Sequence, residues 1–136
     1  MGKSIFSLLK ADQTTVANGV VIDYGEAGKW RLAYAGPQNK AFAEVVRKKF
    51  APYQVQINTG TMDEAAMSRL IAELYADNIV LGWEGVFGED GEPLKFTREN
   101  VIMVLMELPE FFADIQNESK KLANFRTVDL GVEEKN

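Results

Sequence analysis

A chain of 136 residues with 46% hydrophobic and 26% charged residues is long enough for one domain with its own core, and this composition argues against wholesale disorder. The formal net charge is -5 and the isoelectric point about 4.8, which argues against nucleic acid as a partner because lysine and arginine dominate phosphate binding. The absence of cysteine and histidine excludes disulfides, thiolate nucleophiles, Cys/His zinc sites and Ser-His-Asp triads.

The N-terminal segment, residues 1–18, shows no clear periodicity. We expect residues 1–17 to be flexible, as we do residues 127–136 at the other end. The start of the chain lacks the apolar core and the cleavage site of a signal peptide, and no stretch approaches the roughly 18 apolar residues of a membrane span. We therefore expect a soluble, cytoplasmic protein that contacts no membrane.

Alternating apolar residues then predict a β-hairpin. Trp30, Leu32 and Tyr34 alternate with charged or small residues, which is the pattern of a half-buried strand. Val20 and Ile22 can share one face of a preceding strand. The residues between the two runs include two glycines, which favours a turn there.

From about residue 40 the apolar period becomes helical. Phe42, Val45, Val46 and Phe50 form one stripe of a helix, and Pro52 is expected to end it. The three cations at residues 47–49 are interpreted as a solvated helix face in preference to a nucleic-acid patch.

The clearest amphipathic pattern follows. Thr61 is placed as an N-cap, with Glu64 at the third helical position, which is the arrangement of a capping box. The expected apolar stripe consists of Met67, Leu70, Ile71, Leu74 and Tyr75.

Two further helices are predicted near the C-terminus. Thr97 can cap a helix whose body, residues 101–106, is apolar on every side, as in a helix buried in a core or in a partner. Pro109 breaks that helix and suits the first turn of the next. The chain is thus predicted to be one α+β domain, residues 1–136, predominantly helical, with a small N-terminal β-hairpin and a short extended segment around residues 79–87.

Residues 80–100, VLGWEGVFGEDGEPLKFTREN, concentrate acids, glycines and aromatics, but their spacing does not suit chemistry. A calcium loop starting at Asp90 would place Leu94 and Phe96 at ligand positions. Acids this close together on a turn do not supply the rigid, unequal pair of general acid–base catalysis. We interpret Asp90-Gly91 as a tight turn, and we predict no catalytic, metal-binding or cofactor-binding residue.

The aromatic residues of this region have two readings. Trp83, Phe87, Phe96, Phe111 and Phe112 are interpreted mostly as core residues. The alternative is a surface that docks a partner, because aromatic residues are enriched at interfaces.

As a string, the same region resembles the tail assembly chaperones of long-tailed bacteriophages. In that family a V-x-G-W-x-G element precedes a D-G-E-P-L-P-F-T/S-x-E-N segment, and an N-F pair often closes the last helix. The matching elements here are residues 82–85, 90–94, 96–100 and 124–125, and they include Gly82, Trp83, Asp90, Gly91, Pro93, Phe96, Thr97, Asn100, Asn124 and Phe125. Lys95 stands where a proline is common, and the turn is longer by a Gly88-Glu89 step. The strong part of the resemblance covers about residues 79–125.

The resemblance implies a non-catalytic protein without a cofactor. Such chaperones bind the tape measure protein, keep it soluble and promote assembly of the tail tube, which makes the major tail protein a further expected partner. They act in the host cell cytoplasm and are not expected in the finished virion. The residues expected to bind the partner are Phe111, Phe112, Ile115, Leu122, Met103 and Met106. The sequence leaves homo-oligomerisation open.

The family also implies a longer, frameshifted isoform. The last residues, Glu134-Lys135-Asn136, can be encoded GAA AAA AAC, which contains the slippery heptamer A AAA AAC. We therefore expect a minor longer product that shares this N-terminus.

Two other classes stay open at this stage. One is a structural tail or head–tail completion protein that is retained in the virion. The other is a small hydrolase, which would require Glu84 and Asp90 to converge in a concave pocket.

Overall fold

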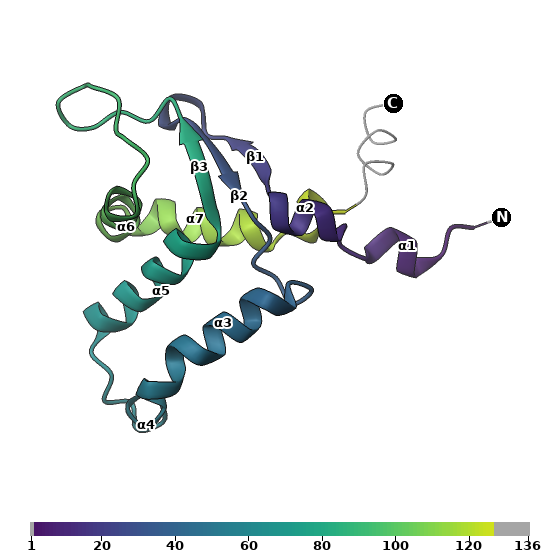
Figure 1. The fold of residues 1–136 in the computed structure, drawn as a ribbon, viewed down its shortest axis with the longest axis horizontal. Helices are drawn as coiled ribbons and strands as arrows, with labels where there is room; N and C mark the ends of the chain where they lie inside the picture. Colours follow the sequence, from purple (N-terminus) through teal and green to yellow (C-terminus); the bar gives the residue numbers. More distant parts are fainter. Residues whose placement is uncertain (1, 127–136) are drawn as a thin grey trace.

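The computed structural model describes residues 2–126, in which three strands form an antiparallel sheet with the order β1-β2-β3 and helices pack against it (Figure 1). This arrangement confirms the predicted, predominantly helical α+β class. The strands are β1 (Val20–Asp23), β2 (Lys29–Leu32) and β3 (Val80–Glu84). The α-helices are α1 (Ile5–Leu9), α2 (Gln13–Asn18), α3 (Lys40–Phe50), α4 (Gln54–Thr59), α5 (Glu64–Asn78), α6 (Arg98–Glu107) and α7 (Pro109–Lys120). Short 3-10 helices are η1 (Gly25–Ala27), η2 (Ala51–Tyr53) and η3 (Leu122–Asn124).

The predicted hairpin is confirmed, and the expected extended segment forms a third strand. Ile22 pairs with Trp30 across β1 and β2, and Trp30 pairs with Trp83 across β2 and β3. The turn between β1 and β2 needs a glycine at position 28, where φ is 96° and a Cβ atom would lie 2.7 Å from the carbonyl oxygen of Glu84.

Helices α3 and α5 run side by side in opposite directions, with α4 at the end far from the sheet (Figure 1). Asn39 caps α3, since its Oδ1 accepts a hydrogen bond from the Phe42 amide at 3.0 Å. The helix ends at Phe50, and Pro52 falls in the 3-10 turn that follows, as predicted.

The capping box predicted for α5 is wrong. The Thr61 amide donates to the carbonyl of Gln56 at 2.9 Å, so this residue helps to end α4 instead of starting α5. Asp63 is the N-cap, and its Oδ2 accepts from the Ala66 amide at 3.0 Å. The apolar stripe was predicted correctly, because Leu70, Leu74 and Tyr75 are buried and Ile71 and Met67 are partly buried.

The two C-terminal helices begin where the sequence places them. The Thr97 Oγ1 accepts from the Asn100 amide at 3.1 Å, and Pro109 occupies the first turn of α7. One side of α6 is buried and contributes Val101, Ile102 and Leu105 to the core.

The main core lies between the sheet and helices α3, α5, α6 and α7. Through this core and out to its edge, neighbouring rings meet edge to face at centroid distances between 4.8 and 5.2 Å, in the order Phe96, Trp83, Trp30, Phe111, Tyr24. The rings of this series come from β2, β3, α7 and the segments next to the strands. Since rings that touch in this way also bury large apolar areas, the series joins the sheet to the last helix.

The N-terminal segment differs from the expectation of loose structure. Residues 5–9 and 13–18 form the helices α1 and α2, and Ala11 and Val16 are buried in a second cluster with Tyr34 and Phe125. The Asp12 amide also donates to the Phe125 carbonyl at 2.8 Å. Residues 11–18 are therefore packed onto the C-terminal end of the described chain, whereas α1 has no buried residue. The expectation for residues 127–136 lies outside the described residues.

Candidate partner-binding groove

The surface between α3, α5 and α7 is hollowed into a groove of about 600 Å³, which we name the α3–α5 groove. It is lined by Ala35, Gly36, Pro37, Phe42, Ala43, Val46, Phe50, Ile71, Leu74, Tyr75, Gln116 and Lys120. Among the described residues of this lining, Lys120 is the one charged side chain. The groove is thus an apolar concavity with polar groups on the α7 side.

The groove follows from the apolar stripes of the two helices. Phe42, Val46 and Phe50 lie at i, i+4 and i+8 on α3, and Ile71 and Tyr75 lie at i and i+4 on α5. Phe42 is buried, whereas Val46, Phe50 and Ile71 pack against the core and keep part of their surface exposed. The stripes are therefore wider than the contact between the helices, and the excess apolar surface forms the walls of the groove.

The floor of the groove is uncharged. The Tyr75 ring contacts Phe42 at 5.9 Å and Phe112 at 5.3 Å, and burial raises the pKa of the Tyr75 hydroxyl, although a hydrogen bond with Ser119 opposes this. The buried Ser119 hydroxyl donates to the Gln116 carbonyl at 3.0 Å. At neutral pH the floor therefore presents neutral aromatic and aliphatic groups.

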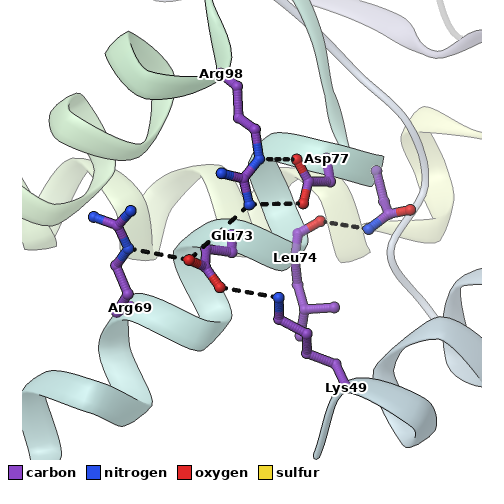
Figure 2. Close-up of polar contacts among 7 residues, drawn as sticks. Lys49, Arg69, Glu73, Leu74, Asp77 and Arg98 are labelled. Carbon is purple, nitrogen blue, oxygen red and sulfur yellow. Dashed lines mark hydrogen bonds and ion pairs between the residues drawn. The ribbon is translucent and has the colours of Figure 1, made fainter.

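A network of ion pairs fixes α3 and α6 to α5 (Figure 2). Glu73 on α5 accepts from Lys49 of α3 at 2.9 Å and from Arg69 at 3.1 Å. Arg98 of α6 holds both oxygens of Asp77 at 2.7 and 3.2 Å. The hydrogen bond from Lys49 is the largest cause that holds the pKa of Glu73 below its usual range, with Arg69 adding to it against the effect of burial. These contacts set the distance between α5 and the C-terminal end of α3. The width of the groove depends on that distance.

The residues predicted to bind a partner do not share one surface. Phe112 and Ile115 are buried in the main core, so neither offers an exposed surface to a partner in this conformation, and their role in binding stays a prediction. Phe111 lies between Trp30 and Tyr24 in the aromatic series. The physical reason is that α7 crosses the sheet and turns its apolar stripe inward.

The other three predicted partner-binding residues lie in different places. Leu122 packs against the second cluster, and Met106 packs against the main core. Met103 on α6 is 41% exposed. None of the three lines the α3–α5 groove.

The segment that resembles the tail assembly chaperones, residues 82–100, forms a closed loop beside β3. The Gly88 amide donates to the Glu92 carbonyl at 2.8 Å, Gly91 has φ of 81°, and the Asp90 Oδ1 accepts from the Glu92 amide at 3.0 Å. Pro93 pairs with Phe87 in an isolated β-bridge. The prediction of a turn at Asp90-Gly91 is confirmed.

The loop is attached to the sheet and to α6 by the remaining matched residues. Trp83 Nε1 donates to the Leu94 carbonyl at 2.9 Å, and the Trp83 ring contacts Phe96. Asn100 Nδ2 donates to the Lys95 carbonyl at 2.8 Å. Gly82 precedes Trp83 in β3, and open space surrounds the position where a Cβ would stand. These residues hold the backbone in place.

The predicted core role of the aromatic residues holds for Phe112, which is buried, and for Phe111 and Trp83, which pack against the main core. Phe87 and Phe96 are both exposed, so the core interpretation does not hold for these two.

The acids of this segment do not converge. Glu84 lines a separate hollow of about 620 Å³ with Glu26 and Phe87, beside the β1–β2 turn. Asp90 is not part of that lining. Within residues 2–126, no group of three or more acidic, histidine or cysteine side chains is placed to hold a metal ion. The geometry that a Glu84–Asp90 hydrolase would require is not found in this part of the chain.

The sequence did not identify the groove, although its residues were recognised as helix stripes. A stripe shows which side of a helix is apolar, but the fraction of that side which stays uncovered depends on how far apart the helices pack. The signal for the groove in the sequence is the width of the apolar stripes of α3 and α5, each of which includes aromatic and branched side chains.

Fold and groove define a small α+β protein with an apolar concave surface on its helical side. Residues 37–136 match the model of the family described as YdaY prophage protein, and the chain belongs to that family. The match runs from Pro37, in the loop before α3, to residue 136, and it indicates a phage-derived protein. Comparisons with curated proteins and with solved structures gave no match. No helix in the described part of the chain is long and apolar enough to cross a membrane.

Proposed function

We propose that this protein is a non-catalytic tail assembly chaperone, which binds the tape measure protein, keeps it soluble and promotes assembly of the tail tube around it. The observation that carries the proposal is the apolar α3–α5 groove. Membership of a prophage family and the resemblance of residues 79–125 to tail assembly chaperones support the phage-specific part.

The physical need for such a protein is the exposure of apolar surface. A very long helical chain presents apolar stripes that self-associate until the tail tube encloses them. A groove can cover one such stripe by accepting side chains spaced at i, i+3, i+4 and i+7.

The proposal includes the expected setting of the protein. It acts in the host cell cytoplasm, without a cofactor, together with the major tail protein and with a longer isoform of itself. It leaves the assembly before the virion is complete. A protein that is instead retained as a tail or head–tail component would be detected by mass spectrometry of purified particles.

The test is co-expression with the tape measure protein of the same prophage. Val46→Asp places a charge in the groove wall, and Val55→Asp places the same charge on α4, where the side chain is 76% exposed. We expect the wild-type protein and V55D to keep the tape measure protein in the soluble fraction, and V46D to lose this effect. Circular dichroism melts of both variants establish that they are folded.

A tape measure protein that is equally soluble with and without this chain would refute the proposed function. Retained activity of folded V46D would place the binding surface elsewhere on the molecule.

A further inference from the structure

We propose that the α3–α5 groove selects a helix whose apolar stripe is flanked by acidic residues. The inference rests on the proposed function, because it specifies the chemistry of the chain that the groove would bind. It is carried by the charges on the two rims of the groove, which differ in sign from the charge of the whole protein.

Helix α3 is a basic element in an acidic protein. Its eleven residues contain four cations, Lys40, Arg47, Lys48 and Lys49, and one anion, Glu44, for a net charge of +3. The whole chain carries -5. A partner with acidic residues is therefore repelled by most of the surface and attracted to this side of the molecule.

Helical spacing places two of these cations beside one wall of the groove, although neither belongs to its lining. Ala43 is part of the lining, and Lys40 and Arg47 are three residues before it and four residues after it, which places them on the same side of the helix. Lys120 lies on the opposite rim, on α7. An apolar floor between cationic rims fits an apolar stripe with acids on both sides.

The rim cations are available to a partner. The side chains of Lys40 and Lys120 make no hydrogen bond or ion pair with another residue in the part of the chain that the structure describes. Arg47 pairs with Glu44, but both side chains are at least half exposed, and such a pair is weak enough to exchange for an acid of the partner.

The floor and the rims of the groove contribute differently to binding. Apolar burial in the groove supplies most of the affinity, whereas the rim charges supply discrimination and faster association. Because exposed charges are screened over about 8 Å at physiological ionic strength, the discrimination is expected to shrink at high salt while apolar binding persists.

A second copy of this chain is a poorer occupant. Its most exposed apolar helix is α1, where Ile5 and Phe6 project into solvent with Lys10 at the end of the same surface. Helix α1 contains no acidic residue. Its approach would bring like charges together at the rims, which disfavours it relative to an acidic helix.

The probes are two designed, fluorescently labelled helical peptides with the same leucine stripe, one flanked by glutamates and the other by lysines. Their affinities for the full-length protein are measured by fluorescence anisotropy at low and high salt. We expect the glutamate peptide to bind about tenfold or more tightly at low salt, with a smaller ratio at high salt.

The variants separate charge from folding. Lys40→Glu combined with Lys120→Glu should abolish or reverse the preference, and Lys120→Gln should reduce it. Lys95→Glu, a charge reversal on the loop beside β3, should leave it unchanged. Equal affinity of the two peptides for the wild-type protein, or an unchanged preference in the folded double variant, would overturn the inference.

The outcome is separable from that of the proposed function. Selection of the glutamate peptide without any effect on the solubility of the tape measure protein supports the groove chemistry and refutes the chaperone role. Solubilisation that depends on Val46 but a peptide preference that ignores the rim charges supports the role and refutes this inference. Self-association that is lost in V46D, measured by sedimentation, would show the groove to be filled by a second copy and would also overturn it.

Discussion

Replacing Ile115 by alanine distinguishes a packed last helix from a docking helix. Ile115 lies on α7 with 0% of its surface exposed, inside the main core. The change removes three carbon groups, worth about 0.8 kcal/mol each on burial, and leaves a cavity that the surrounding core fills only in part. We expect the free energy of unfolding to fall by about 3 to 4 kcal/mol.

The assay is urea denaturation followed by the fluorescence of Trp30 and Trp83, which contact each other in the core. The midpoint should fall without a change in the dependence on urea, because the surface exposed on unfolding is nearly the same. Met103→Ala is the matched control, since Met103 is 41% exposed on the neighbouring helix. Its cost should stay within about 0.5 kcal/mol.

A fall in the free energy of unfolding of less than about 1 kcal/mol for Ile115→Ala would refute the reasoning, because truncating a fully buried isoleucine in a well-packed core destabilises a protein by more than that. If the stable variant also failed to keep the tape measure protein soluble, the result would indicate that α7 binds the partner directly.

Three further changes test local features of the fold. Thr97→Ala should cost about 1 kcal/mol in a denaturation experiment, because the Asn100 amide loses its cap, and Thr97→Ser should restore most of it. Gly28→Ala should lower the melting temperature by an amount equivalent to about 2 kcal/mol or more, since φ is 96° and the new Cβ would meet the Glu84 carbonyl; a neutral result would mean that the turn rearranges freely. Glu73→Gln should cost about 1 kcal/mol at neutral pH. The pKa of Glu73 is lowered from its usual 4.5, so the stabilisation by its ion pairs is complete above that pH and is lost as the pH falls through the lower folded pKa. The stabilities of wild type and variant, measured in urea titrations, should therefore converge once the pH is below that folded pKa.

Features with a local cause could be predicted from the sequence. The start of α6 depends on a hydroxyl at Thr97 within reach of the Asn100 amide, and the start of α7 depends on the fixed φ of Pro109. The hairpin follows from alternation within a few residues, as Trp30 and Leu32 show. Each of these signals is complete within one turn or one strand.

The start of α5 shows why a local signal can fail. Thr61 and Asp63 both carry side chains that can cap a helix, and they lie two residues apart. The choice is made by the preceding helix: Gly60 takes the left-handed conformation at the end of α4, and the Thr61 amide closes that end by donating to Gln56. A capping-box motif considered alone does not account for this competition between Thr61 and Asp63 for the N-cap position.

Helices α1 and α2 were missed for a related reason. With five and six residues they are too short to show a helical period, and what holds α2 in place is Phe125, more than a hundred residues away in the sequence. The same limit applies to the site. Helical spacing placed Phe112 and Ile115 on one apolar side of α7, but only the packing of α7 across the sheet decides whether that side meets the core or a partner.

The segment that resembles the tail assembly chaperones, residues 82–100, has a structural role, although its acidic residues suggest a metal-binding or catalytic site. Its matched residues form contacts within the chain: Trp83 donates to the Leu94 carbonyl, Asp90 accepts from the Glu92 amide, and Thr97 caps α6. None of them lines the α3–α5 groove. The segment that carries the resemblance is therefore a framework that sets β3 and α6 relative to each other. The surface proposed to bind the partner lies apart from it, on α3, α5 and α7.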